Sequence, residues 1–122
     1  MPSRRLQRLN EQFKRELMEI IRVDLKDPRV SNITITAVFT TPDLAHARVL
    51  ITTLASENER PAILAGLDHA RPFLRSELSR RIRARRVPDL EFEWDKTLDH
   101  ARRIDQLLAE IRFNEPEPGG NE

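Results

Sequence analysis

Arginines cluster in one short segment of the chain, and their guanidinium groups are suited to binding phosphate. Five of the seven residues from 80 to 86 are arginine: Arg80, Arg81, Arg83, Arg85 and Arg86. Residues 71–86 carry a net charge of +6 with Glu77 as their only acid, whereas the whole chain carries +1. A guanidinium can grip phosphate with two hydrogen bonds and stack on a base, which an ammonium cannot. The segment therefore predicts a surface that meets nucleic acid.

Two other interpretations of the arginine cluster stay open. The arginines could form a solvated helix face laced with salt bridges. They could also meet an acidic protein, which would make the chain an interaction adaptor. We favour nucleic acid over the salt-bridged face because pairing with Glu77 alone cannot neutralise the segment.

Common catalytic signatures are absent from the sequence, which has no GxxxxGK[ST], GxGxxG, HExxH or GxSxG motif. The histidines His46, His69 and His100 are scattered and lack an obvious partner for general-base work. One alternating segment carries four acids: Asp89, Glu91, Glu93 and Asp95. A metal-dependent nuclease using them is the least favoured alternative, and a solvated strand face paired with arginines is preferred. We predict no enzyme, no metal site and no cofactor.

Composition restricts the compartment. The chain has no cysteine, which is typical of a reducing cytoplasm. Its longest apolar runs fall far short of the roughly 18 residues that a membrane span needs. We predict a cytoplasmic protein without a membrane segment.

The N-terminal residues predict one amphipathic helix. Five apolar side chains share a face at spacings of three and four: Leu6, Leu9, Phe13, Leu17 and Ile20. Ser3 is the expected N-cap, and Pro28 should end the helix near Leu25. A second stripe is mostly basic: Arg4, Arg8, Glu11, Arg15 and Arg22.

Two strands joined by a short turn follow. Residues 33, 35, 37 and 39 are apolar, which predicts that all four face the core. Residues 41–44 form the turn, and alternation resumes from Ala47 to Thr53. Adjacent strands with a short connection predict an antiparallel hairpin.

Pro72 interrupts the next helical pattern. A proline inside a helix loses a hydrogen bond and clashes with the preceding turn, whereas it fits the first position of a helix. We therefore expect two helices, over residues 62–70 and 72–83, that meet with a bend at residues 70–72. The second buries Leu74, Leu78 and Ile82 and leaves its arginines outside that stripe.

A third strand and a last helix complete the pattern. The strand starts at Pro88 and points Leu90, Phe92 and Trp94 to one side. The helix spans about residues 99–111. The order α-β-β-α-α-β with a C-terminal helix predicts an α+β fold, a three-stranded sheet with helices on one face. Residues 1–113 should form this single domain, and residues 114–122 a disordered acidic tail rich in proline and glycine.

Four segments, in this order and spacing, resemble the bacterial ribosome-binding factor A family. They are residues 4–30 with the motif KDPRV, residues 33–49 with ITITAV, DL and ARV, residues 73–90 with FLRSEL and RRVPDL, and residues 92–108 with FEWD and RIDQLL. The family's KH-type domain usually bends at an Ala-x-Gly kink. Here the matching positions are Ala70-Arg71-Pro72, and proline adds bulk and offers no N–H to an RNA backbone at that point.

The resemblance implies a KH-like (type II) domain that acts as a ribosome assembly factor. Such a protein binds the immature small (30S) ribosomal subunit and assists late maturation of 16S rRNA, including 5′-end processing. It would be a monomer and a stoichiometric RNA binder rather than a catalyst. From the charge pattern, the expected RNA-binding residues are Arg4, Arg5, Arg8, Arg15, Arg71, Arg75, Arg80, Arg81, Arg83, Arg85 and Arg86.

Overall fold

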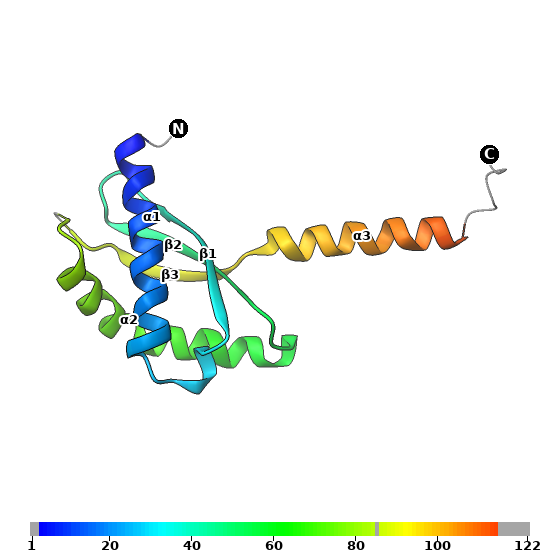
Figure 1. Cartoon of the computed structure of the whole chain (residues 1–122), viewed down its shortest axis with the longest axis horizontal. Helices are drawn as coiled ribbons and strands as arrows, with labels where there is room; N and C mark the ends of the chain where they lie inside the picture. Colours follow the sequence, from blue (N-terminus) through cyan, green and yellow to red (C-terminus); the bar gives the residue numbers. More distant parts are fainter. Residues whose placement is uncertain (1–2, 85, 115–122) are drawn as a thin grey trace.

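A computed structural model describes residues 3–84 and 86–114 of the chain. Its helices are α1 (Arg4–Glu19), α2 (Arg60–Arg81) and α3 (Lys96–Asn114), and its strands are β1 (Ile33–Thr40), β2 (His46–Thr53) and β3 (Asp89–Trp94). A π-helical turn, Ile20–Asp24, extends α1, and short 3-10 turns occupy Pro28–Val30 and Glu57–Glu59. Figure 1 shows α1 and α2 packed around the sheet, while α3 projects away from it.

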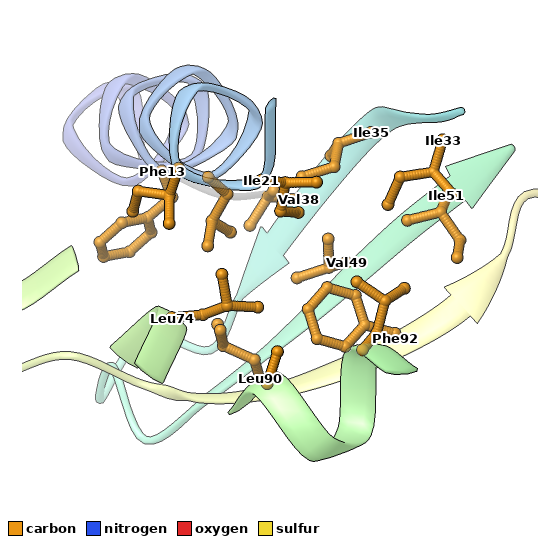
Figure 2. Packing of buried hydrophobic residues seen from close by; sticks show 14 of the residues in the cluster. Phe13, Ile21, Ile33, Ile35, Val38, Val49, Ile51, Leu74, Leu90 and Phe92 are labelled. Carbon is orange, nitrogen blue, oxygen red and sulfur yellow. The ribbon is translucent and has the colours of Figure 1, made fainter. Parts of the chain in front are cut away.

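The sheet combines two directions of pairing. Its strand order is β1-β2-β3, with β1 and β2 antiparallel and β2 and β3 parallel. One face is buried under α1 and α2, and its core side chains are Ile33, Ile35, Val38, Ala47, Val49, Ile51, Leu90 and Phe92. Figure 2 shows Phe13, Val49 and Leu90 pointing into one layer between the helices and the strands. The predicted hairpin is therefore confirmed, and α1 and α2 lie on one face of the sheet as predicted, whereas α3 does not.

The predicted alternation of β1 is wrong in its second half. Ile35 pairs with Ile51 and Ala37 pairs with Leu50, so the intervening residue is an extra one in a β-bulge. A bulge of one residue exchanges the two faces of the strand beyond it. Val38 and Thr40 are buried as a result, whereas Phe39, which was expected in the core, is 51% exposed.

The predicted division into two helices at Pro72 is also wrong, because α2 runs through the proline as a single helix. Pro72 removes the helical partner of the carbonyl four residues earlier, at Asp68. Both residues are exposed, so water can reach that carbonyl. Buried side chains before and after the proline, among them Leu67 and Leu74, hold both halves on the core. A bend remains, since the two halves of α2 run in different directions (Figure 1).

The helical ends were predicted more closely than the interior of α2. The Ser3 side chain accepts a hydrogen bond from the Leu6 N–H at 3.1 Å, as expected of an N-cap, and the π-helical turn that extends α1 ends at Asp24, next to the expected Leu25. The last helix extends three residues beyond the expected range at each end. The predicted tail was to begin at Asn114, which the structure places at the end of α3, and residues 115–122 lie outside the described residues.

No helix in the described part of the chain is both long and apolar enough to cross a membrane.

Candidate nucleic-acid interface

A groove at one end of the molecule is formed by three segments that are distant in sequence. They are the first two turns of α1, the β1–β2 turn and the residues that follow α2. The groove has a volume of about 1080 Å³ and is lined by Ser3, Arg4, Arg5, Leu6, Arg8, Leu9, Gln12, Pro42, Asp43, Leu44, Arg83 and Ala84. It therefore brings together four of the predicted arginines from the two basic regions of the sequence.

The α1 wall of the groove owes its position to local sequence. Because Ser3 caps the helix, Arg4 and Arg5 occupy its first turn, and Arg8 lies one turn further along the same face as Arg4. All three are exposed. No acid occupies that first turn, although the positive end of a helix dipole favours acids there. This wall is therefore strongly electropositive.

The β1–β2 turn is held by one aspartate. The Asp43 carboxylate accepts hydrogen bonds from the Thr41 hydroxyl at 2.7 Å and from the Ala45 N–H at 3.0 Å. These bonds, the Thr41 one first, lower the pKa of Asp43, and the positive charge of Arg86 lowers it further. Leu44 follows with φ at 60°, the only positive φ of a residue other than glycine in the described residues. The turn thus places a strained leucine in the groove.

Two of the predicted RNA-binding arginines are engaged with β3 and the loop before it. Arg71 donates to the carbonyl of Leu90 at 3.2 Å. Arg75 donates to the carbonyls of Pro88 at 3.2 Å and Val87 at 3.0 Å, and lies 3.4 Å from an Asp89 carboxylate oxygen. These side chains link α2 to the edge of β3 that no other strand pairs with.

Two more arginines of the cluster are paired with acids. Arg80 forms an ion pair with Glu77 at 3.2 Å. Arg81 contacts Glu16 on α1 at 3.6 Å and also Asp24, so it joins the C-terminal end of α2 to the N-terminal helix. Glu77 is the only acid within the segment, and folding brings further acids, Glu16 and Asp24, to it from other elements.

The remaining arginines differ from these four. Within residues 3–84 and 86–114, no ion pair is formed by Arg4, Arg5, Arg8, Arg15, Arg83 or Arg86. Arg15 is exposed on α1 beyond the groove lining, and Arg86 is exposed in the loop before β3. Arg85 lies outside the described residues.

The acidic face of β3 is paired with arginine rather than arranged as a metal site. Arg48 on β2 donates two hydrogen bonds, each 3.0 Å long, to the two carboxylate oxygens of Glu93. This pairing lowers the pKa of Glu93. Across the described part of the chain, no group of three His, Cys, Asp or Glu side chains is placed to hold a metal ion.

A second, smaller hollow of about 570 Å³ lies beside Pro72. It is lined by His46, Asp68, Arg71, Pro72, Arg75, Asp89, Leu90 and Glu91. Its charges are mixed, and its arginines already bind carbonyls of β3 and the preceding loop. We therefore expect this hollow to bind phosphate less tightly than the groove does.

Sequence reasoning missed the apolar part of the groove. Leu6 and Leu9 were assigned to the core face of the first helix, and Leu44 was interpreted only as part of a turn. In the structure Leu9 packs against the core as predicted, and all three leucines also line the groove, where Leu44 and Leu9 are half-buried. The Asp43-Leu44 pair between two strands was the one signal available, because a leucine is unusual at a tight turn.

The three-stranded mixed sheet with α1 and α2 on one face is the fold of the KH-like domains of type II. Known proteins agree with this assignment. The sequence profile of ribosome-binding factor A matches residues 5–108. This chain belongs to the ribosome-binding factor A family.

Individual relatives support the assignment at the level of sequence. The ribosome-binding factor A of Azoarcus sp. strain BH72 is 46% identical over 104 residues, which cover 85% of this chain and 82% of that one. The corresponding protein of Macrococcus caseolyticus is 41% identical over 109 residues, or 89% and 96% of the two chains.

Solved structures show the same fold. The crystal structure of ribosome-binding factor A from Thermus thermophilus superposes with a TM-score of 0.65 at 35% identity, covering 72% of this chain and 93% of that one. A Thermus thermophilus homology model, fitted into a cryo-EM map of a complex between the 30S subunit and ribosome-binding factor A, gives a TM-score of 0.60 at 33% identity, with 74% and 94% covered.

Proposed function

We propose that this chain binds the immature small ribosomal subunit and assists late maturation of 16S rRNA, including the processing of its 5′ end. The observation that carries the proposal is its family membership over residues 5–108, together with the 30S complex known for a relative of the same fold. The chain would act in the cytoplasm as a monomer, with residues 1–113 as its binding domain.

The mechanism is stoichiometric and needs no catalytic group. Arginines that contact phosphates release condensed counterions, which favours binding and makes the affinity depend on salt. A protein that binds one rRNA conformation better than another shifts the population toward it by its difference in affinity. The arginines without ion pairs in the described structure, Arg4, Arg5, Arg8, Arg15, Arg83 and Arg86, are the best candidates for these contacts.

Co-sedimentation with ribosomal particles tests the proposal. On a sucrose gradient, the chain should travel with small subunits carrying unprocessed 16S rRNA and not with mature 70S ribosomes. Cells lacking the protein should accumulate 16S rRNA with an extended 5′ end. Failure to associate with any small-subunit particle would contradict the proposed function. A complex that survives RNase treatment would instead favour a protein adaptor.

A further inference from the structure

We propose that the groove between α1, the β1–β2 turn and the residues after α2 binds a single strand of RNA. Its arginines hold the phosphates, and its apolar floor, formed by Leu6, Leu9, Pro42, Leu44 and Ala84, receives an unstacked base. This inference rests on the proposed function and assigns RNA recognition to this groove rather than to the hollow beside Pro72.

The charges of the groove have the arrangement that a polyanion requires. Arg4, Arg5 and Arg8 form one wall and Arg83 contributes to another, so positive charge approaches a bound strand from two elements. The lining also holds one acid, Asp43, whose carboxylate is hydrogen-bonded to the Thr41 hydroxyl and the Ala45 N–H, so the lining carries a net charge of +3. In the described structure none of the four forms an ion pair, unlike the arginines further back along α2. One carboxylate cannot neutralise four guanidinium groups around one hollow, and a bound polyanion would reduce the repulsion that remains.

Leu44 supplies an independent argument. A leucine rarely adopts a positive φ, because its Cβ crowds the following carbonyl, and glycine or asparagine tolerates this conformation far better. Strained backbone of this kind is concentrated at ligand contacts. Leu44 has a φ of 60° and lines the groove. We therefore infer that the Leu44 side chain contributes to binding in the groove, and that this contribution offsets the strain of the turn.

The floor favours a single strand over a duplex. Leu6, Leu9, Pro42, Leu44 and Ala84 give the groove an apolar surface between its arginines. In a duplex the bases are stacked inside, and only phosphates and ribose would reach such a concave surface. A single strand can turn a base out onto an apolar or guanidinium surface while its backbone follows the positive charge.

The usual KH route for a single strand is obstructed here. KH domains hold the RNA backbone with a glycine-containing loop between two helices. In this chain α2 is continuous and Pro72 occupies that region without an N–H. Beside it, Arg71 donates a hydrogen bond to the Leu90 carbonyl and Arg75 donates one to the Pro88 carbonyl. A single strand of RNA would have to displace both arginine side chains to reach the edge of β3.

Binding of three defined probes tests the groove. They are a fluorescein-labelled single-stranded RNA octamer of mixed sequence, a labelled RNA duplex of twelve base pairs and a labelled poly-glutamate peptide, each titrated with the full chain. The variants are Arg83→Gln, Leu44→Gly and Leu44→Asn. The matched control is Arg22→Gln, which removes one exposed charge that is paired with Glu19 and lies outside the groove lining.

The parent should bind the octamer more tightly than the duplex or the peptide. Arg83→Gln should weaken octamer binding about fivefold or more, and the Leu44 variants about tenfold through lost apolar burial, whereas Arg22→Gln should change it little. Both Leu44 variants should keep or raise the melting temperature, because they relieve the positive φ. The Leu44 variants would then lose octamer affinity without losing melting temperature. A leucine that only packs against the turn would lower both when it is replaced.

Several outcomes would overturn the groove assignment. They are preference for the duplex, equal binding of the peptide, unchanged octamer affinity in all groove variants, or no octamer binding at concentrations that saturate small subunits. Equal loss of stability and affinity in both Leu44 variants would show that Leu44 only packs the turn. Each of these results can occur while the parent still co-sediments with small subunits, so the proposed function would survive it.

Discussion

The paired and unpaired arginines of this chain occupy different regions and have different consequences. Along α2, Arg71 and Arg75 bind carbonyls of β3 and its preceding loop, while Arg80 and Arg81 bind carboxylates. At the groove, Arg4, Arg5, Arg8 and Arg83 surround a hollow and form no ion pair in the described structure. One residue type thus serves two purposes, and its surroundings decide which.

This difference between the two regions changes how a basic segment should be interpreted. The net charge of +6 over residues 71–86 does not measure the charge available to RNA. An arginine already held by carboxylates or carbonyls would have to exchange those partners for phosphate, and the gain is then small. Arginines without such partners exchange only water and counterions.

Loss of the groove arginines should have the largest effect. The combined variant Arg4→Gln, Arg5→Gln, Arg8→Gln and Arg83→Gln should weaken binding to small subunits at least about tenfold. The slope of log K against log salt should become shallower by about 3, at roughly 0.7–0.9 for each lost phosphate contact. Thermal stability should stay the same or rise, because like charges are removed. Binding of particles over a salt series measures the slope.

The control for this variant removes charges elsewhere. Arg22 and Lys26 are exposed and lie outside the groove lining. Their double change to glutamine should shift the slope by less than the groove variant does. If the two variants weaken binding to the same extent for each charge removed, only net charge matters and the comparison fails.

Loss of the paired arginines should chiefly affect stability. Arg71→Gln with Arg75→Gln frees three carbonyls that now accept charged hydrogen bonds. Since both side chains are nearly half exposed, water can replace part of the interaction. We expect unfolding free energy to fall by about 1–2 kcal/mol and the melting temperature by several degrees. Fluorescence of the single tryptophan, Trp94, can follow denaturant unfolding.

The same double variant sharpens the comparison when it is tested on ribosomal particles. At a temperature where it is fully folded, its affinity for small subunits should stay within about twofold of the parent. A loss of affinity as large as that of the groove variant would place Arg71 and Arg75 in the RNA interface.

Arg48 provides a smaller test. It lies on the face of the sheet that α1 and α2 do not cover, where it is exposed and hydrogen-bonded to Glu93. Its hydrogen bonds lower the pKa of Glu93, so Glu93 is more acidic in the folded than in the unfolded chain. The resulting stabilisation is complete above the ordinary carboxyl pKa of about 4.3 and is lost as pH falls through the lowered value. Arg48→Gln should therefore be less stable than the parent at neutral pH.

The difference between parent and Arg48→Gln should shrink on acidification below that ordinary pKa. Denaturant unfolding across a pH series gives the measurement. Affinity for small subunits should not change. A stability difference that is independent of pH would mean that Arg48 acts through packing, as a long arginine side chain can.

Removal of residues 114–122 should have the smallest effect. The segment contains no large apolar residue and three glutamates, so its deletion should move the melting temperature by no more than a degree or two. The net charge would rise from +1 to +4, since three negative charges are lost. Affinity for RNA should stay the same or rise slightly. A clear fall in melting temperature would show that these residues stabilise the domain.

Local pattern determined most of the secondary structure. The apolar spacing of α1, the Ser3 cap, the alternation of β2 and the buried pair Leu90 and Phe92 all follow from rules that involve neighbours in sequence. The order of elements then predicted an α+β sheet with helices on one face. The four similar segments in their spacing led to the correct family.

Tertiary contacts decided what local pattern could not. The bulge in β1 depends on pairing with β2, and α2 continues past Pro72 because both of its halves are buried on the core. Arg81 finds Asp24, which lies 57 positions earlier in the chain, and Leu44 joins Arg5 and Arg83 around one groove. Helical and strand periodicity records only which residues share a face. Which charges are neutralised, and which surround a hollow, depends on chain segments that meet only after folding.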